Sequence, residues 1–276
     1  MNLLVFARLA VVESARRRLL WALVVLTVVI ALLTGWAFDR LAAIVREQGL
    51  DESEVRLGVS QLVILVAFMF SFVLTMTAAF LGAPAIGAQI ESGVALAVVA
   101  RPVRRSTVLV GSWLGLCVIV AGYAVGSGLV EMAIVRMVTG YLPPDPGGAV
   151  VFLSAEAIVL LTLALVTGVW LSPIASGAIA VVVFGLTWVA GVLGGIGLLF
   201  DVPALVAAAD TSRYLVPVDG LWRAVVWSLE PGELLLIAAG RPAAFQANPF
   251  FAAHGPEPTY LAWAVGWVVV VLLIGI

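Results

Sequence analysis

The chain has 276 residues, of which 63% are hydrophobic and only 11% are charged, and its mean hydropathy is +1.20. Soluble domains carry about 45–50% apolar and about 25% charged residues, so this composition excludes a soluble globular protein. The formal charge of −2 comes from 14 arginines against 16 acids, because the sequence contains no lysine. A G-x-x-x-x-G-K phosphate loop and a lysine Schiff base are therefore excluded, and the single Cys117 and single His254 offer no zinc-type ligand cluster.

The first element is the stretch 2–18, in which apolar positions alternate with arginines and one acid. Its imperfect helical stripe predicts an amphipathic helix lying at the membrane interface. A cleaved signal peptide fits less well, because the apolar run that follows is too long for a signal core and no A-x-A-like site closes it.

Six apolar segments follow, and a membrane-spanning helix needs roughly 20 apolar residues. They predict an all-α polytopic membrane protein whose residues 1–276 form a single transmembrane domain. The segments are 19–38, 59–87, 108–136, 149–171, 174–200 and 259–276.

Five connections join these segments: 39–58, 88–107, 137–148, the turn at Ser172 and Pro173, and 201–258. The acidic segment 39–58 predicts a short surface helix with a turn at Gly49. The long segment 201–258 contains two amphipathic pieces, "DGLWRAVVWSL" and "GELLLIAAG", which predict re-entrant or interfacial helices before the last span. Sequence alone leaves open whether these pieces form a lateral gate or a packing cap over the spans.

Charge predicts the orientation of the chain. Segments 1–18 and 88–107 hold four and three arginines with one acid each, whereas 39–58, 137–148 and 201–258 have an excess of acids. Arginine-rich short loops stay in the cytoplasm. Both termini, the 88–107 segment and the turn at Ser172 are therefore expected on the cytoplasmic side.

The polar segment "QIESGVALAVVARPVRRS", residues 89–106, has a pattern beyond its charge. A short helix starting near Ser92 or Gly93 would carry apolar residues and end at Pro102, beside an arginine-rich corner. Such a half-apolar helix outside the bilayer suits a groove on a partner protein. The alternative is a plain loop whose arginines only fix the topology.

These residues resemble the coupling segment of type-2 ABC transporter permeases, where an acid, a glycine, an apolar run and an "RPV-x-R" corner separate the second and third spans. The interfacial helix, the six spans and "PVDGLWR" at 217–223 resemble the same family. Ser112 departs from the pattern, since the family often has a lysine at this place. The resemblance assigns ATPase coupling to Glu91, Gly93, Leu96, Arg101, Pro102 and Arg105.

The resemblance implies a non-enzymatic permease subunit of an ATP-driven exporter in the cell membrane. A separate cytoplasmic ATPase would bind ATP and magnesium, so no cofactor is expected in this chain. Two permease subunits, as a homodimer or a heterodimer, would enclose the pathway. Membrane lipid is the remaining expected partner, and no nucleic acid is expected.

Three polar residues in or near the spans are candidates for lining the pathway: Glu131, Glu156 and Tyr123. Ionisable groups in hydrocarbon are costly and usually face an interior or a cavity. The alternative for the glutamates is an interfacial position with a snorkelling side chain, or a structural pair of Glu131 with Arg136.

Other classes of function are less consistent with the sequence. An ion-coupled secondary transporter is expected to show inverted repeats and ionisable groups at mid-membrane, and no convincing repeat is present. A membrane enzyme needs a nucleophile, a base or a metal set near one interface. A non-transporting membrane scaffold is the remaining alternative.

Overall fold

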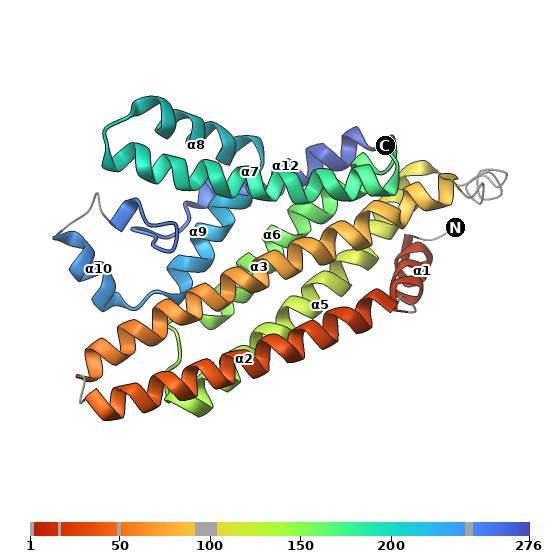
Figure 1. Cartoon of the computed structure of the whole chain (residues 1–276). Coiled ribbons are helices and arrows are strands. Elements are labelled where there is room, and N and C mark those ends of the chain that lie inside the picture. The colour runs from red at the N-terminus through yellow and green to blue at the C-terminus, as the bar shows by residue number, and fades with distance from the viewer. Residues whose placement is uncertain (1–2, 16–17, 49–50, 92–103, 241–244) are drawn as a thin grey trace.

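The structure is a computed structural model that describes residues 3–15, 18–48, 51–91, 104–240 and 245–276. These residues form ten helices and no strand, which confirms the all-α polytopic fold (Figure 1). Five helices are long and apolar enough to cross a membrane. They are α2 (Arg18–Gln48), α3 (Glu52–Glu91), α5 (Arg105–Thr139), α6 (Pro146–Thr167) and α7 (Pro173–Leu199).

The first three of these helices are longer than the sequence predicted. At 1.5 Å per residue, the 40 residues of α3 extend about 60 Å, twice the roughly 30 Å of a hydrocarbon core. The expected separate surface helix at 39–58 is wrong, because α2 continues to Gln48 and α3 begins at Glu52. Residues 39–48 are mostly strong helix formers and contain no proline or glycine, so nothing ends α2 earlier.

Helix α6 is the centre of the bundle and its most buried span. It packs against α3, α5, α7 and α9, and Leu160, Leu161 and Leu165 are fully buried. Glycines bring α3 and α6 close together. A β-carbon on Gly82 would lie 2.9 Å from the carbonyl oxygen of Leu161, which no real side chain tolerates.

Helix α1 (Leu3–Ala15) packs along the first half of α5. Gly111 and Gly115 line this contact on α5, and a β-carbon on Gly111 would lie 2.6 Å from that of Phe6. A β-carbon on Gly115 would overlap the carbonyl group of Ala7. The small-xxx-small spacing of these two glycines therefore joins α1 to α5 within one chain.

Replacing Gly115 by valine is expected to push α1 away from α5 and to destabilise the protein by about 1–3 kcal/mol, the usual cost of overpacking. Thermal unfolding in detergent measures this loss. Gly122→Val is the matched control on the same helix, because a β-carbon there meets nothing within 4 Å. Equal melting temperatures for the two variants would contradict the close α1–α5 contact.

The long connection before the last span forms three helices, α8 (Pro203–Leu215), α9 (Val218–Leu229) and α10 (Gly232–Ala239). The two amphipathic pieces correspond to α9 and α10, whereas α8 was not predicted. The chain reverses at Asp201, whose φ is 54°, and α8 then runs back along α7 (Figure 1). Gly194 and Gly197 allow this approach, since β-carbons there would clash with Ala209 and Leu205 of α8.

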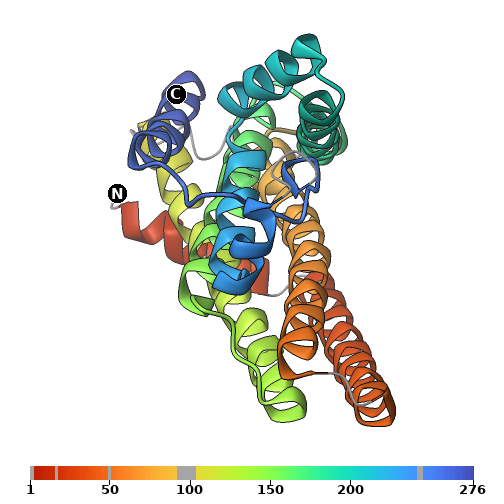
Figure 2. The same ribbon diagram turned by 90° about the vertical axis from the view of Figure 1, so that its left-hand side faces the viewer.

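Helix α9 is a core element of the bundle. Leu221, Trp222, Val225 and Val226 are each at most 2% exposed, and α9 lies in the middle of the view in Figure 2. It packs on α6 and also contacts α3 and α7. The structure therefore supports the packing role for this piece and not a position on the membrane surface.

The sixth predicted span corresponds to α12 (Pro258–Ile274), a shorter apolar helix of 17 residues. It ends where α3 ends, where α5 begins and where α1 lies (Figure 1). We call this end of the bundle the α3–α5 end. The opposite end, where α2 ends and α3 begins, is the α2–α3 end. The turn between α6 and α7 also lies at the α3–α5 end, as the charge pattern predicted for one side of the membrane.

Candidate functional site

The two described ends of the predicted coupling segment lie at the α3–α5 end. Glu91 is the last residue of α3, and Arg104 and Arg105 stand exposed at the start of α5. The remaining predicted coupling residues, Gly93, Leu96, Arg101 and Pro102, lie outside the described residues. The structure thus places the two ends of the segment at one end of the bundle, joined to two of its longest helices.

Several side chains at the α3–α5 end are exposed. Arg8 of α1 is exposed, and the turn between α6 and α7 exposes Trp170 and Ile174 at 59% and 86%. The turn itself is fixed, since the hydroxyl groups of Thr167 and Ser176 are 2.7 Å apart and hydrogen-bonded.

Glu131 is buried in the core, with 4% of its surface exposed. The hydroxyl group of Thr34 on α2 faces its carboxyl group. Arg136 is exposed, and among the described residues the structural pair of Glu131 with Arg136 is not formed. The side chain lines a small cavity of about 30 Å³ between α3, α5 and α6, together with Ser127. Glu131 is therefore not a snorkelling interfacial residue.

Glu156 lies deeper in the bundle, on α6, and is 2% exposed. The hydroxyl group of Ser71 on α3 donates a 2.9 Å hydrogen bond to its Oε1. Tyr123 of α5 is half-buried against α2, where its hydroxyl group is hydrogen-bonded to that of Thr27. Lining of a pathway by these three residues stays a prediction, and within one subunit both glutamates are core residues.

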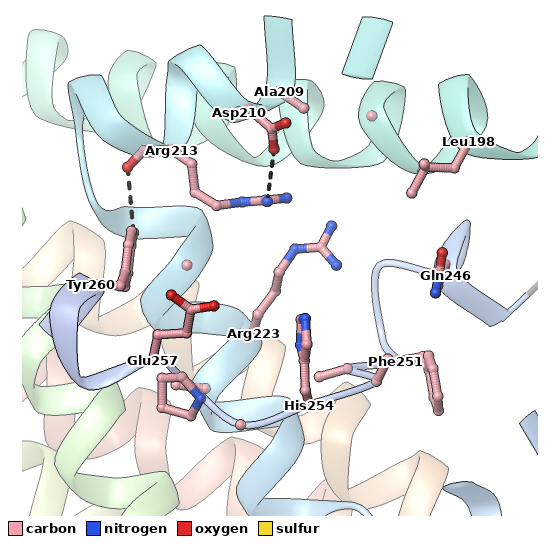
Figure 3. Close-up of a pocket in the computed structure, with 18 of the residues that line it drawn as sticks. Leu198, Ala209, Asp210, Arg213, Arg223, Gln246, Phe251, His254, Glu257 and Tyr260 are labelled. Atoms are coloured by element: carbon pink, nitrogen blue, oxygen red, sulfur yellow. Dashed lines mark hydrogen bonds and ion pairs between the residues drawn. The ribbon is translucent and has the colours of Figure 1, made fainter. Parts of the chain in front are cut away.

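A cavity of about 390 Å³ is bounded by α7, α8, α9 and the segment that leads into α12. We call it the polar cavity (Figure 3). Its wall includes Gly194 and Leu198 of α7, Asp210 and Arg213 of α8, Arg223 of α9, and Tyr260 of α12. Pockets of about 300–1,000 Å³ are the usual size of small-molecule sites.

Two arginines in the wall of this cavity, one from α8 and one from α9, bind the same buried aspartate of α9. Oδ2 of Asp219 accepts hydrogen bonds from Nε of Arg213, at 2.7 Å, and from Nε of Arg223, at 3.2 Å. We call these residues the Arg–Asp–Arg triad. Asp219 is buried, and its carboxylate occupies the space that a β-carbon on Gly191 of α7 would need. The triad therefore joins α8 and α9 to each other and to α7.

Sequence reasoning missed the triad, although one signal was present. Asp219 and Arg223 are four residues apart within a piece predicted to be helical, which is the spacing of an intrahelical ion pair. Arg213 carried no such signal, because its contact with Asp219 depends on how α8 and α9 pack. In the described part of the chain, no three His, Cys, Asp or Glu side chains are grouped for a metal.

A second polar contact fixes the segment beside the polar cavity. Both carboxyl oxygens of Glu230, at the end of α9, lie within hydrogen-bond distance of the amide nitrogen of Ala252, at 3.1 and 3.2 Å. The indole Nε1 of Trp222 donates a 3.1 Å bond to the carbonyl oxygen of Pro249. Burial raises the pKa of Glu230 to about 8, and the hydrogen bond from Ala252 opposes this rise.

The raised pKa predicts a loss of stability as pH rises. The folded protein holds the Glu230 proton up to about pH 8, whereas the unfolded chain releases it near pH 4.5. The free energy of unfolding therefore decreases as the pH rises from about 4.5 to about 8, and it does not change further above pH 8. We expect wild type to lose on the order of a few kcal/mol relative to Glu230→Gln over this window.

Thermal unfolding of both proteins at pH 5.5 and pH 8.5 measures this difference. The glutamine keeps an acceptor for Ala252 but does not titrate, so its melting temperature is expected to change less with pH. Parallel changes in the two proteins would show that Glu230 is not the titrating group.

Comparison with known proteins bears on the whole chain. The family model described as "ABC-2 family transporter protein" matches residues 6–276. No curated protein matches the chain significantly. The match includes α1, all five long helices, the polar cavity and α12, so it is not confined to one motif.

Proposed function

The chain belongs to the ABC-2 family of transporter proteins and is a multi-pass permease subunit of an ABC transporter, and we propose that it exports its substrate when a separate cytoplasmic ATPase engages residues 89–106. ATP and magnesium would bind to that ATPase. The observation that carries the proposal is the family match over residues 6–276 in a chain that lacks the lysine of a phosphate loop.

The arrangement of helices supports a mechanical role for the coupling segment. The segment connects the end of α3 to the start of α5, so a force on it acts directly on helices of 40 and 35 residues. Helix α3 packs along α6 and α7, and α5 packs along α1, α2 and α6. Because α6 contacts both helices, closure of an ATPase against this segment would act on the core of the bundle through α3 and α5 together.

Pro84 of α3 is well placed to modify this movement. It lies within the helix, two turns before Glu91, and its missing amide hydrogen removes one helical hydrogen bond. Gly87 follows one turn later, where a β-carbon would lie 3.0 Å from the carbonyl oxygen of Gly168. The last turns of α3 therefore combine a weakened helix with a close contact to the α6–α7 turn.

We place the α3–α5 end in the cytoplasm and the α2–α3 end outside, in the cell membrane, on the distribution of arginines and acids. Two copies of the permease, or one copy with a related subunit, would enclose the pathway. Glu131, Glu156 and Tyr123 remain the proposed polar residues near that pathway. Their burial within one subunit implies that helix movement must precede any contact of the glutamates with substrate.

Isolation of the protein from its native host in mild detergent tests the proposal. We expect a stoichiometric partner that carries a phosphate-loop lysine, and the mass of the complex gives the number of permease copies. Failure to recover an ATPase, even after crosslinking at residues 89–106, would favour an ion-coupled transporter instead.

A further inference from the structure

The polar cavity is built around guanidinium groups that still have donors to offer. Arg213 and Arg223 each use Nε to bind the same oxygen of Asp219, and among the described residues no Nη group of either arginine donates a hydrogen bond to that carboxylate. Figure 3 shows the Arg223 side chain extending into the space between Arg213, His254 and Gln246.

Only some of these Nη groups donate a hydrogen bond within the protein. Arg213 Nη1 donates to Asp210 Oδ1 at 3.1 Å, and Arg223 Nη2 makes a long 3.5 Å contact with the carbonyl oxygen of Gly191. Among the described residues, Nη2 of Arg213 and Nη1 of Arg223 have no hydrogen-bond acceptor. The cavity therefore presents unused, charge-assisted donors from two arginines.

The charges around the cavity differ in how strongly water screens them. The side chains of Arg213 and Arg223 are only 26% and 25% exposed, and Asp219 between them is 6% exposed. Asp210 is 56% exposed, so solvent weakens its field. Glu257 is also exposed and already accepts a hydrogen bond from the hydroxyl group of Thr259. The inner part of the cavity thus has two cations against one carboxylate.

We propose that the polar cavity binds an anionic oxygen group, a phosphate or a carboxylate, between the Nη groups of Arg213 and Arg223. Paired guanidinium forks match the geometry of such groups, because each presents parallel N–H donors. Asp210 then acts as a competitor, since it occupies Nη1 of Arg213 when the site is empty. The proposal does not depend on the ATPase or on the direction of transport.

Two sources of this chemistry are compatible with the surroundings. A soluble anion would enter from the aqueous side. A phospholipid headgroup would enter from the membrane, where Leu198, Tyr214 and Leu215 beside the cavity expose 46%, 58% and 67% of their surfaces. The binding chemistry is the same for both, so the experiment must separate them.

Thermal unfolding of the full-length protein in a neutral detergent, at fixed pH and ionic strength, tests the site with two probes. One is inorganic phosphate titrated against chloride, and the other is short-chain phosphatidylglycerol titrated against the matching diacylglycerol. A binding ligand raises the melting temperature in proportion to its occupancy. Stabilisation by both probes identifies a soluble-anion site, and stabilisation by phosphatidylglycerol alone identifies a lipid-headgroup site.

Two variants with opposite expected effects decide whether the polar cavity is the site. Arg223→Gln removes one guanidinium group and is expected to weaken the apparent binding of the anionic probe by about tenfold. Asp210→Asn removes the competitor and is expected to strengthen it by roughly threefold, a gain that a folding defect does not produce. Arg40→Gln, an exposed arginine on α2 outside the cavity, is the matched control and is expected to bind like wild type.

The proposal is overturned if neither probe stabilises the wild-type protein. It is also overturned if Arg223→Gln and Arg40→Gln respond to the probes alike, since binding would then lie elsewhere. Unchanged or weaker binding by Asp210→Asn would remove Arg213 from the site.

Discussion

Reversing the charge of Arg101 and Arg105 together is expected to weaken association with the ATPase by about tenfold or more, because both arginines would face acids on the partner surface. The loss would uncouple ATP hydrolysis from movement of the spans. Arg105 is exposed at the start of α5, so its replacement leaves the packed core intact. The dissociation constant of the purified permease and ATPase, measured at physiological salt, reports the effect.

Arg40→Glu is the matched control for this variant, since Arg40 is also exposed but lies near the α2–α3 end. It should bind the ATPase like wild type. The melting temperatures of all three proteins should agree within a few degrees, because surface substitutions usually change stability by less than about 0.5 kcal/mol. Normal association and coupling in the double variant would show that residues 89–106 only set the topology.

Replacing Asp219 by alanine is expected to destabilise the protein by about 3 kcal/mol, the largest effect of any single change considered. The substitution leaves two arginines, each about three-quarters buried, without the carboxylate that binds both. Removing one partner of a buried ion pair typically costs about 3–5 kcal/mol. Because solvent reaches the polar cavity, we expect a cost at the lower end of this range. Unfolding by sodium dodecyl sulfate, titrated in mixed micelles, measures the change.

Asp210→Ala separates this effect from the loss of any nearby acid. Asp210 also pairs with Arg213, but it is 56% exposed, and exposed pairs contribute about 0–1 kcal/mol. Gly191→Ala perturbs the same site from α7, since the added methyl group would displace the Asp219 carboxylate. We expect Asp219→Ala and Gly191→Ala to be strongly destabilised and Asp210→Ala to be near wild type. Equal effects of the two aspartate variants would contradict the role of the triad.

The sequence was sufficient to predict the spans because hydrocarbon imposes a strong and local constraint. Each span must be apolar over roughly 20 residues, and that pattern can be read without knowing any contact. Their order and the helical N-terminal stretch were therefore predictable. The spacing of the glycines on α5 is visible in the sequence, but only the structure shows that Gly111 and Gly115 contact α1, whereas a β-carbon on Gly122 or Gly126 would meet nothing within 4 Å.

The remaining features depend on contacts that local patterns do not encode. The region 39–58 is an exception, because its strong helix formers continue α2 and α3 and only its polarity suggested a separate element. Helix α8 is short and mixed in composition, and its position follows from glycines on α7. The Arg213–Asp219 contact likewise requires the turn between α8 and α9.

The candidate site was predictable only in part. The arginine-rich corner at 101–105 was recognisable from its motif, because the family resemblance depends on residues close together in the chain. The polar cavity draws its wall from α7, α8, α9 and α12, and no short motif spans those helices. Glu156 was recognised as an intramembrane acid, but its partner Ser71 is 85 residues away.

Site-specific photocrosslinking in native membranes tests most directly whether an ATPase engages the α3–α5 end. A photoreactive amino acid at position 105 should crosslink to a single protein that contains a phosphate loop, and the same probe at position 40 should not. Crosslinking at 105 should also change when a non-hydrolysable ATP analogue is present in inverted vesicles. A probe at 105 that captures only lipid, or captures an ATPase no better than the probe at 40, would contradict the proposed coupling.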